Sequence, residues 1–192
     1  FSVKNEACRH AGPQALPKSV DDFIRLRTKL MAAPTELERA YGGATLFLYA
    51  LMVRSQDRSL GDKLVVMSLA KDELVKGDTY RGYTWRRGGA GYHLDRLAKR
   101  PHIAWSHAVG SDPQRQYKVD PSAPVTIVYR QQTKYVPKVE TGQYKVFACT
   151  SGAATCRPIS LTRNSRGIWK VKNFSSLSVD IQPVHQDDGD TL

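Results

Sequence analysis

The residues best suited to binding chemistry gather in one stretch, YRGYTWRRGGAGYH, at positions 80–93. Three arginines and four aromatic residues share these fourteen positions. Aromatic rings can stack on nucleic-acid bases, and arginines can neutralise phosphates. We therefore identify Tyr83, Trp85, Arg86 and Arg87 as candidate ligand-binding residues.

Three interpretations of this stretch stay open. The first is a surface loop whose aromatic rings pack on the protein while its arginines remain in water. The second is a surface for a protein or an acidic glycan, because Trp, Tyr and Arg dominate binding hot spots. The third is a nucleic-acid site, which is less favoured because the chain carries no recognisable DNA- or RNA-binding signature.

Glycines in the same stretch offer a second kind of chemistry. Gly88, Gly89 and Gly91 stand before a predicted helix, so backbone N–H groups and the helix N-terminus could hold an anion. Neither a preceding strand nor a following Lys-Ser/Thr pair is evident, so the stretch does not match a nucleotide-binding fingerprint.

The sequence contains few patterns that are typical of catalytic residues. Ser151 lacks the glycine pattern of a nucleophile elbow. His93, His102 and His107 are candidates for a base, and a pocket joining His93 or His107 to a carboxylate would favour an enzyme. His102 and His107 are five residues apart, with the cysteines elsewhere, so no zinc spacing is present. We expect no catalytic residue, no metal and no cofactor.

Cysteine spacing suggests one disulfide. Cys149 and Cys156 flank the small-residue stretch TSGAAT, which can bring two strand ends within bonding distance. In an oxidising compartment we expect these two to pair, which would leave Cys8 over. The alternative is two separate thiols, one of them buried as a small apolar residue.

Composition describes a folded, strongly basic chain. Its 192 residues are 41% hydrophobic and 24% charged, which is ordinary for one folded domain. The 29 Lys+Arg against 18 Asp+Glu give a net charge of +11, which favours polyanions as partners, although solubility alone would also explain it. The longest apolar run, residues 44–53, is about half of a membrane span, so no transmembrane segment is expected. Because the chain begins with Phe1, we expect either a processed form, such as one without its secretion signal, or a chain given without its leader.

Helical signals fill the first part of the chain. Ser19 is suited to cap a helix whose apolar residues recur at helical spacing. Thr35 and Glu38 have the spacing of a capping box and open a second helix running toward Arg54, which is apolar nearly all round and should be the most buried element. Residues 59–70 predict a third helix.

Two glycines interrupt the second predicted helix. Gly42 and Gly43 weaken it by roughly 1 kcal/mol each relative to alanine. Their presence predicts either a close contact with another helix or a break in the helix at that point.

From residue 102 onward the apolar period becomes that of strands. Segments 102–109, 125–130 and 143–150 can be extended, 157–163 and 168–174 predict a hairpin with its turn at residues 164–167, and 177–184 predicts a last strand. The fold class is therefore α+β, with N-terminal helices packed on a C-terminal, largely antiparallel curved sheet of the nuclear-transport-factor or cystatin type.

The expected organisation is one domain with two short flanks. Residues 1–18 predict an irregular arm, and residues 19–183 a single α+β domain that is mainly helical over 19–100 and mainly β over 101–183. Residues 184–192 predict an acidic tail.

The segments RPHIAWSHAVGSDPQRQYKVDP, YKVFACTSGAATCRPISLTRNSRGIWKVKNFSSLSVDIQP and GGATLFLYALMV carry a family resemblance. The chain resembles an uncharacterised bacterial domain-of-unknown-function family with a shared phrase like KVFV-SSGAD-RPI-L-N-G-WKV-SSL, over most of residues 20–183. The resemblance implies a bacterial protein, often secreted or envelope-associated, and brings no catalytic or ligand residue. This chain departs from the phrase at Cys149 and Cys156.

These observations lead to one expectation with two alternatives. We expect a secreted or periplasmic bacterial binding module, non-enzymatic, with a basic aromatic surface for a protein or acidic glycan. The alternatives are a hydrolase or other enzyme acting on a phosphorylated or polyanionic substrate, and a nucleic-acid-binding domain.

Overall fold

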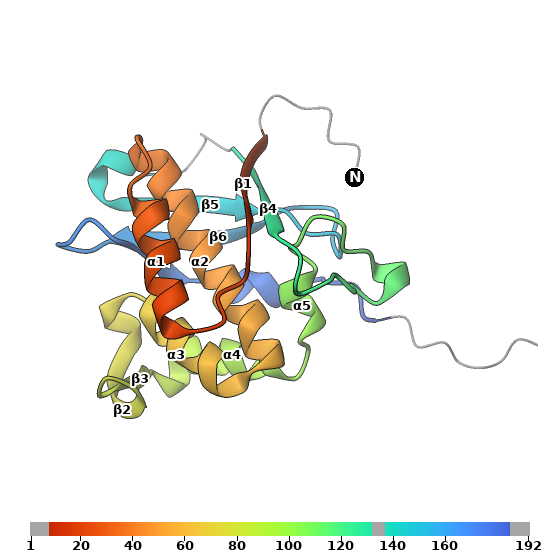
Figure 1. Ribbon diagram of the computed structural model, residues 1–192, viewed down its shortest axis with the longest axis horizontal. Helices are drawn as coiled ribbons and strands as arrows, with labels where there is room; N and C mark the ends of the chain where they lie inside the picture. Colours follow the sequence, from red (N-terminus) through yellow and green to blue (C-terminus); the bar gives the residue numbers. More distant parts are fainter. Residues whose placement is uncertain (1–7, 132–136, 185–192) are drawn as a thin grey trace, which may run out of the picture.

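The computed structural model describes residues 8–131 and 137–184, with helices mostly first and a sheet mostly after them (Figure 1). The helices are α1 (Val20–Met31), α2 (Glu36–Gln56), α3 (Arg58–Ser68), α4 (Tyr92–Ala98) and α5 (His102–Trp105). The strands are β1 (Cys8–Gln14), β2 (Leu74–Tyr80), β3 (Tyr83–Trp85), β4 (Val125–Arg130), β5 (Gln143–Ala148), β6 (Arg157–Arg163) and β7 (Trp169–Asn173). The predicted α+β class is confirmed.

The predicted caps begin the first two helices. Ser19 Oγ accepts a hydrogen bond from Asp22 N at the start of α1. At the start of α2, Thr35 Oγ1 accepts from Glu38 N while the Glu38 carboxylate accepts from Thr35 N, which completes the predicted capping box.

Helix α2 is the centre of the molecule. Every residue from Ala40 to Arg54 is buried, and the helix packs against α1, α3, α5 and the sheet. Gly42 and Gly43 do not break it. A Cβ at Gly43 would stand 2.7 Å from Trp169 Cβ, so the bare backbone of α2 touches β7. The predicted close helix contact is made at Gly42, where a Cβ would stand 3.0 Å from Leu30 Cβ on α1, while the closer contact, at Gly43, is with a strand.

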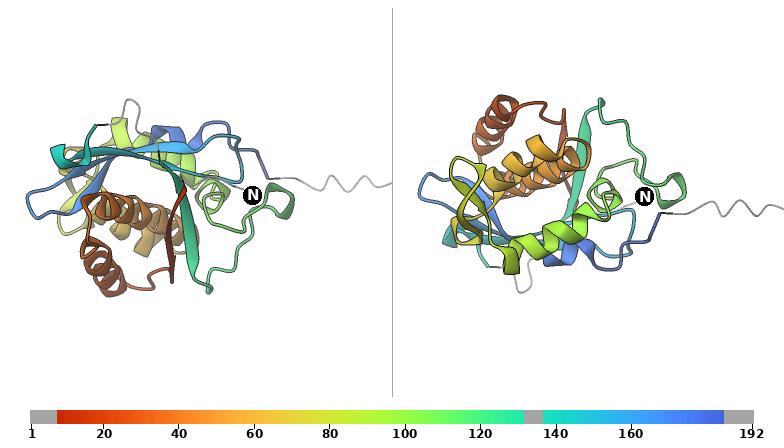
Figure 2. Two further views of the ribbon diagram at one scale, coloured as in Figure 1. Left: turned by 90° about the horizontal axis from the view of Figure 1, so that it is seen from above. Right: turned by 90° about the horizontal axis from the view of Figure 1, so that it is seen from below.

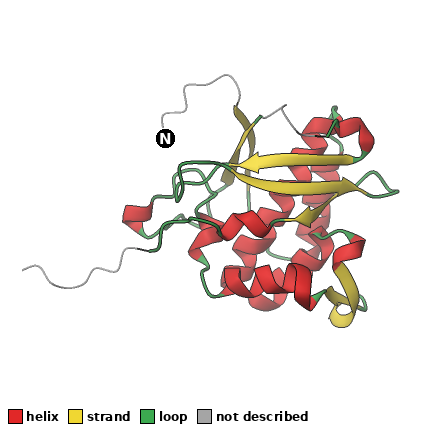
Figure 3. Ribbon diagram, turned by 180° about the vertical axis from the view of Figure 1, so that it is seen from behind, coloured by secondary structure: helices red, strands yellow, loops and turns green. Residues whose placement is uncertain are grey.

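Five antiparallel strands form the main sheet in the order β1-β4-β5-β6-β7. The strands β1 and β4 turn steeply away from β5 and β6, and α1 and α2 lie in the angle between them (Figure 2). From behind, β5 and β6 are seen in front of these two helices (Figure 3). The core face carries the buried residues Val125, Ile127, Tyr129, Val146, Ala148, Ile159, Leu161, Trp169 and Val171.

The prediction of an irregular arm over residues 1–18 is wrong for Cys8–Gln14. This segment is strand β1 and pairs with β4, with a register shift between Ala11 and Gln14. Its sequence, CRHAGPQ, does not alternate apolar and polar residues. The strand forms because its backbone pairs with β4, and this pairing cannot be recognised from the side-chain pattern. Residues 1–7 and most of the predicted acidic tail, 185–192, lie outside the described residues.

Two predicted extended segments are also corrected. Residues His102–Trp105 form α5, because Ile103 and Ala104 bury against the helical layer. Residues 177–184 add no strand: a short 3-10 turn over Ser175–Ser178 follows β7, and Leu177 and Ile181 are buried. In both segments the conformation follows from the burial of single apolar residues and not from the alternation that a strand would show.

The hairpin and the disulfide complete the sheet region. The turn between β6 and β7 lies where it was expected: Gly167 N donates to Asn164 O, and Gly167 has a φ of 74°, which favours glycine. Cys149 and Cys156 are joined by a disulfide, with Cα atoms 4.0 Å apart. The bridge closes the loop between β5 and β6.

Gly43→Ala tests the contact between α2 and β7. Alanine gains roughly 1 kcal/mol in helix propensity, but its methyl group would overlap the Trp169 backbone and Cβ. We expect a net loss of about 1–3 kcal/mol in the free energy of unfolding, measured by urea denaturation. Gly88→Ala is the control, because no atom lies within 4 Å of its added Cβ; a Gly43→Ala variant as stable as that control would contradict the contact.

Candidate functional site

Residues of the β2–β3 ribbon and of the β6–β7 hairpin line one groove. These two hairpins lie at the same end of the molecule (Figure 1). The volume of the groove is about 1010 Å³. We call it the basic groove, and its lining residues are Val66, Leu69, Ala70, Lys71, Asp72, Leu74, Tyr83, Thr162, Arg163, Asn164, Ser165, Arg166, Lys170 and Lys172. Five of these are lysine or arginine and one is aspartate, so the lining is strongly cationic.

Tight turns place the two walls of the groove. In the β2–β3 ribbon, Arg81 and Gly82 both have positive φ, 49° and 81°, as in the two-residue turns that match the twist of a hairpin. This turn follows Tyr80 and leads into Tyr83, which faces the groove. On the other wall, the Asn164–Gly167 turn carries Arg166 at its tip.

Two of the five groove cations are paired with carboxylates. Lys172 Nζ lies 3.1 Å from Asp72 Oδ2, and Arg163 Nη1 lies 2.8 Å from Glu36 Oε1. Burial works to raise the pKa of Glu36, but hydrogen bonds from Arg39, Trp169 and Arg163 outweigh it and hold that pKa below its ordinary value. Glu36 is therefore committed to these partners.

The other groove cations have no such partner. Within residues 8–131 and 137–184, no carboxylate pairs with Lys71, Arg166 or Lys170. The Lys170 ammonium donates to Met67 O instead. These groups add positive charge to the groove that the described chain does not neutralise.

Nearby arginines strengthen the positive field. The pKa of Arg27 is lowered by burial; Tyr80 opposes that shift, and the positive charges of Arg81 and Arg166 add to it. Burial, and then the charge of Arg27, lower the pKa of Lys170 to about 8. We call Arg27, Arg81, Arg166 and Lys170 the basic cluster.

The four predicted ligand-binding residues lie in different surroundings. Tyr83 is 42% exposed and lines the groove. Trp85 is partly buried against the core, with the Arg54 guanidinium 5.5 Å from its ring centroid. Arg86 is exposed and donates to Asp72 O, and Arg87 is exposed. Of the four residues, only Tyr83 lines the groove, and Trp85 packs against the core.

The glycine turn before α4 has a carboxylate beside it. A Cβ at Gly89 would lie 3.0 Å from Glu73 Oε2, so negative charge already stands at the turn and opposes an incoming anion. Glu73 and His93 line one small pocket of about 120 Å³ together with Gly89 and Lys172. His93 Nδ1 is buried without a hydrogen-bond partner in the described structure. Burial and Arg96 lower the pKa of His93, and Glu73 opposes them.

The remaining catalytic candidates have structural partners. His107 is buried, its Nδ1 lies 2.9 Å from Cys149 O, and burial lowers its pKa to about 4. His102 stacks on Tyr117. Ser151 Oγ forms hydrogen bonds with Ser111 Oγ and Ser106 O, so its partners are serines. In the described part of the chain, no three metal-ligating side chains come together.

Most of the basic cluster was not identified from the sequence. Arg27 lies on α1, and Lys170 and Arg166 lie in the β6–β7 hairpin, more than a hundred residues further along. A partial signal existed on β7, where Lys170 and Lys172 alternate with the buried Trp169 and Val171. That pattern shows which side chains of the strand point away from the core but not which residues they face.

The fold and the groove define a basic α+β domain with an open cationic groove. The chain belongs to the family described as Domain of unknown function (DUF6935), whose model matches residues 15–185. The resemblance to a family of uncharacterised domains is thereby confirmed. No curated protein and no solved structure matches the sequence, so the nuclear-transport-factor or cystatin analogy stays an expectation. None of the helices in the described ranges is long and apolar enough to cross a membrane.

The lowered pKa of Lys170 gives a pH prediction. Its folded pKa of about 8 lies below the unfolded value of about 10.4. Between these values the unfolded chain binds more protons, so the stability of the wild type relative to Lys170→Met should rise with pH. We expect a rise of up to about 3 kcal/mol between pH 8 and pH 10.5, measured by denaturation.

Lys172→Met is the matched control. It removes a lysine two positions along the same strand, exposed and paired with Asp72. If the free energies of unfolding of Lys170→Met and of the wild type change equally over this pH interval, the pKa of Lys170 is not lowered in the folded protein.

Proposed function

We propose that this protein is a non-enzymatic binding module that holds an anionic ligand in the basic groove. The observation that carries the proposal is the lining of the groove: Lys71, Arg166 and Lys170 have no carboxylate partner in the described ranges. The charges of Arg27 and Arg81 add to this positive field. Like charges held close together destabilise the free protein, and a bound anion would remove that cost.

The ligand class follows from the shape and lining of the groove. The volume of about 1010 Å³ is at the upper end of the range for small-molecule pockets, and the cationic walls suit a chain of repeated negative charges. Tyr83 offers a half-exposed ring beside the charges. We propose an acidic glycan as the ligand, with an acidic protein segment or a nucleic acid as the alternatives that the binding experiment separates.

The compartment is part of the proposal. Disulfides persist in oxidising compartments, so the Cys149–Cys156 bridge supports a secreted or periplasmic bacterial protein. Alkylation of the protein as isolated from cells provides the test: free thiols at both positions would contradict this location.

Binding to heparin and to single-stranded DNA across a salt series tests the groove. We expect heparin to bind more tightly, with affinity falling steeply as salt rises, because each neutralised anion releases counterions. The double variant Lys71→Gln, Arg166→Gln removes two lining cations that have no carboxylate partner in the described ranges, and it should weaken binding and reduce the salt slope by about 1–2. Binding should also weaken above pH 8, where Lys170 loses its proton.

The matched control is Arg25→Gln, Arg115→Gln. It removes the same charge from two exposed arginines that pair with Asp22 and Asp112 outside the groove. Arg86→Ala with Arg87→Ala tests the surface first identified in the sequence. Equal weakening by the groove and control variants would show that total charge alone attracts polyanions, and the groove would then be rejected as the site.

The pocket that joins His93 to Glu73 favours a second candidate, an enzyme acting on a phosphorylated or polyanionic substrate. His93 would act as a base, and Glu73 would stabilise its protonated form. If p-nitrophenyl phosphate is hydrolysed, His93→Gln and Glu73→Gln should each slow the reaction at least about 100-fold. Hydrolysis that survives both substitutions would reject this candidate.

A further inference from the structure

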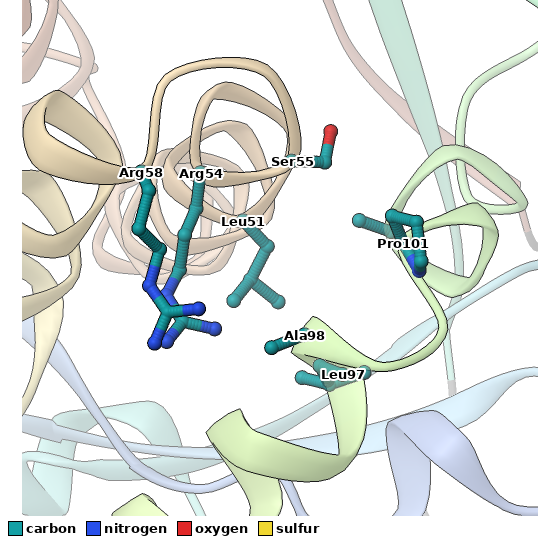
Figure 4. A pocket seen from close by; sticks show the side chains of 8 residues that line it. Leu51, Arg54, Ser55, Arg58, Leu97, Ala98 and Pro101 are labelled. Carbon is teal, nitrogen blue, oxygen red and sulfur yellow. The ribbon is translucent and has the colours of Figure 1, made fainter.

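A third cavity lies at the C-terminal end of α2, where α2 faces α4 and α5. It has a volume of about 190 Å³, and its walls are Leu51, Arg54, Ser55, Arg58, Leu97, Ala98, Pro101 and Ala104. Figure 4 shows the two guanidinium groups side by side, with Leu51, Leu97 and Ala98 beside them and Pro101 opposite. One end of the cavity is thus cationic and the rest is apolar.

The two arginines share one carboxylate. Arg54 Nε lies 2.5 Å from Asp62 Oδ1, and Arg58 Nε lies 3.0 Å from Asp62 Oδ2. Two positive charges against one negative charge leave this end of the cavity with an uncompensated cation. An anion bound here would neutralise this charge.

The arginines also keep unused donors. Arg54 has a side chain only 4% exposed; its Nη1 donates to Leu94 O, but its Nη2 is buried without an acceptor. Arg58 is 56% exposed, and only its Nε has an acceptor in the described structure. The terminal nitrogens of Arg58 can therefore meet a ligand at the mouth of the cavity, while Arg54 supplies positive charge from below.

The apolar walls limit what the ligand can be. Ser55 Oγ already donates to Met52 O and accepts from Trp105 Nε1. The walls other than the arginines and Ser55 are aliphatic, so a polar ligand body would lose hydrogen bonds with water on entering. An engineered cavity of about 150 Å³ holds benzene, so a cavity of about 190 Å³ has room for one ring or a short aliphatic chain.

We propose that this cavity binds a small monocarboxylate with an aromatic or short aliphatic body. The carboxylate accepts two parallel hydrogen bonds from the planar fork of Arg58, and the body rests on Leu51, Leu97 and Ala98. One uncompensated positive charge matches one negative charge. This site is separate from the basic groove and does not depend on the function proposed for it.

Three probes with the same phenylpropyl carbon skeleton separate charge from apolar contact. They are 3-phenylpropionate, 3-phenylpropanol and 3-phenylpropylamine, measured by calorimetry on the whole chain and by NMR shifts of labelled protein. We expect the acid to bind at least about tenfold more tightly than the alcohol, because the alcohol lacks the negative charge and the second acceptor oxygen that the Arg58 fork would bind. The amine should not bind. If the alcohol binds as tightly as the acid, the proposal is overturned.

Two variants test the position. Arg58→Gln should weaken binding of 3-phenylpropionate at least about tenfold, and Arg25→Gln is the matched control, an exposed arginine on α1 that also pairs with a nearby aspartate. Ala98→Phe should block the acid by filling the cavity without changing charge, and Ala98 is exposed, so folding is retained. If Arg58→Gln binds the acid as tightly as Arg25→Gln does, the site is rejected whatever the result with Ala98→Phe.

Discussion

The contact between the backbone of α2 and strand β7 is the constraint on which the rest of the structure depends. Gly43 lets α2 approach Trp169 until no Cβ would fit between them. The Trp169 indole Nε1 then donates to Glu36 at the start of the same helix. Helix α2 is buried along fifteen consecutive residues, Ala40 to Arg54, and α1, α3, α5 and strands of the main sheet all pack against it.

The same contact positions the basic groove. Glu36 accepts hydrogen bonds from Trp169 and Arg39 and pairs with Arg163, so the first turn of α2 is bound to the β6–β7 hairpin that forms one wall. With Glu36 occupied in this way, Lys170 and Arg166 are left facing the groove without a carboxylate in the described structure. Because the contacts of α2 with the β6–β7 hairpin occupy Glu36, the basic groove keeps an excess of positive charge.

At the other end of α2, a buried arginine connects the helix to its neighbours. Arg54 is buried and connects α2 to Asp62 on α3, to Leu94 O on α4 and to the ring of Trp85 on β3. This explains why Trp85, which the sequence marks as a binding residue, is packed against the protein. Trp85 packs against the guanidinium of the buried Arg54, and the residues around position 85 give no sign of this contact with residue 54.

The sequence by itself determined the local elements: the caps at Ser19 and Thr35, the buried helix, the strands with a two-residue period and the turn ending at Gly167. These features arise from neighbouring residues, whose spacing the chain displays directly. Strand β1, helix α5 and the basic cluster were decided only by the tertiary structure. Backbone pairing, burial of single side chains and the meeting of Arg27 with Lys170 all depend on residues far apart in the chain, and the sequence carries no period for such contacts.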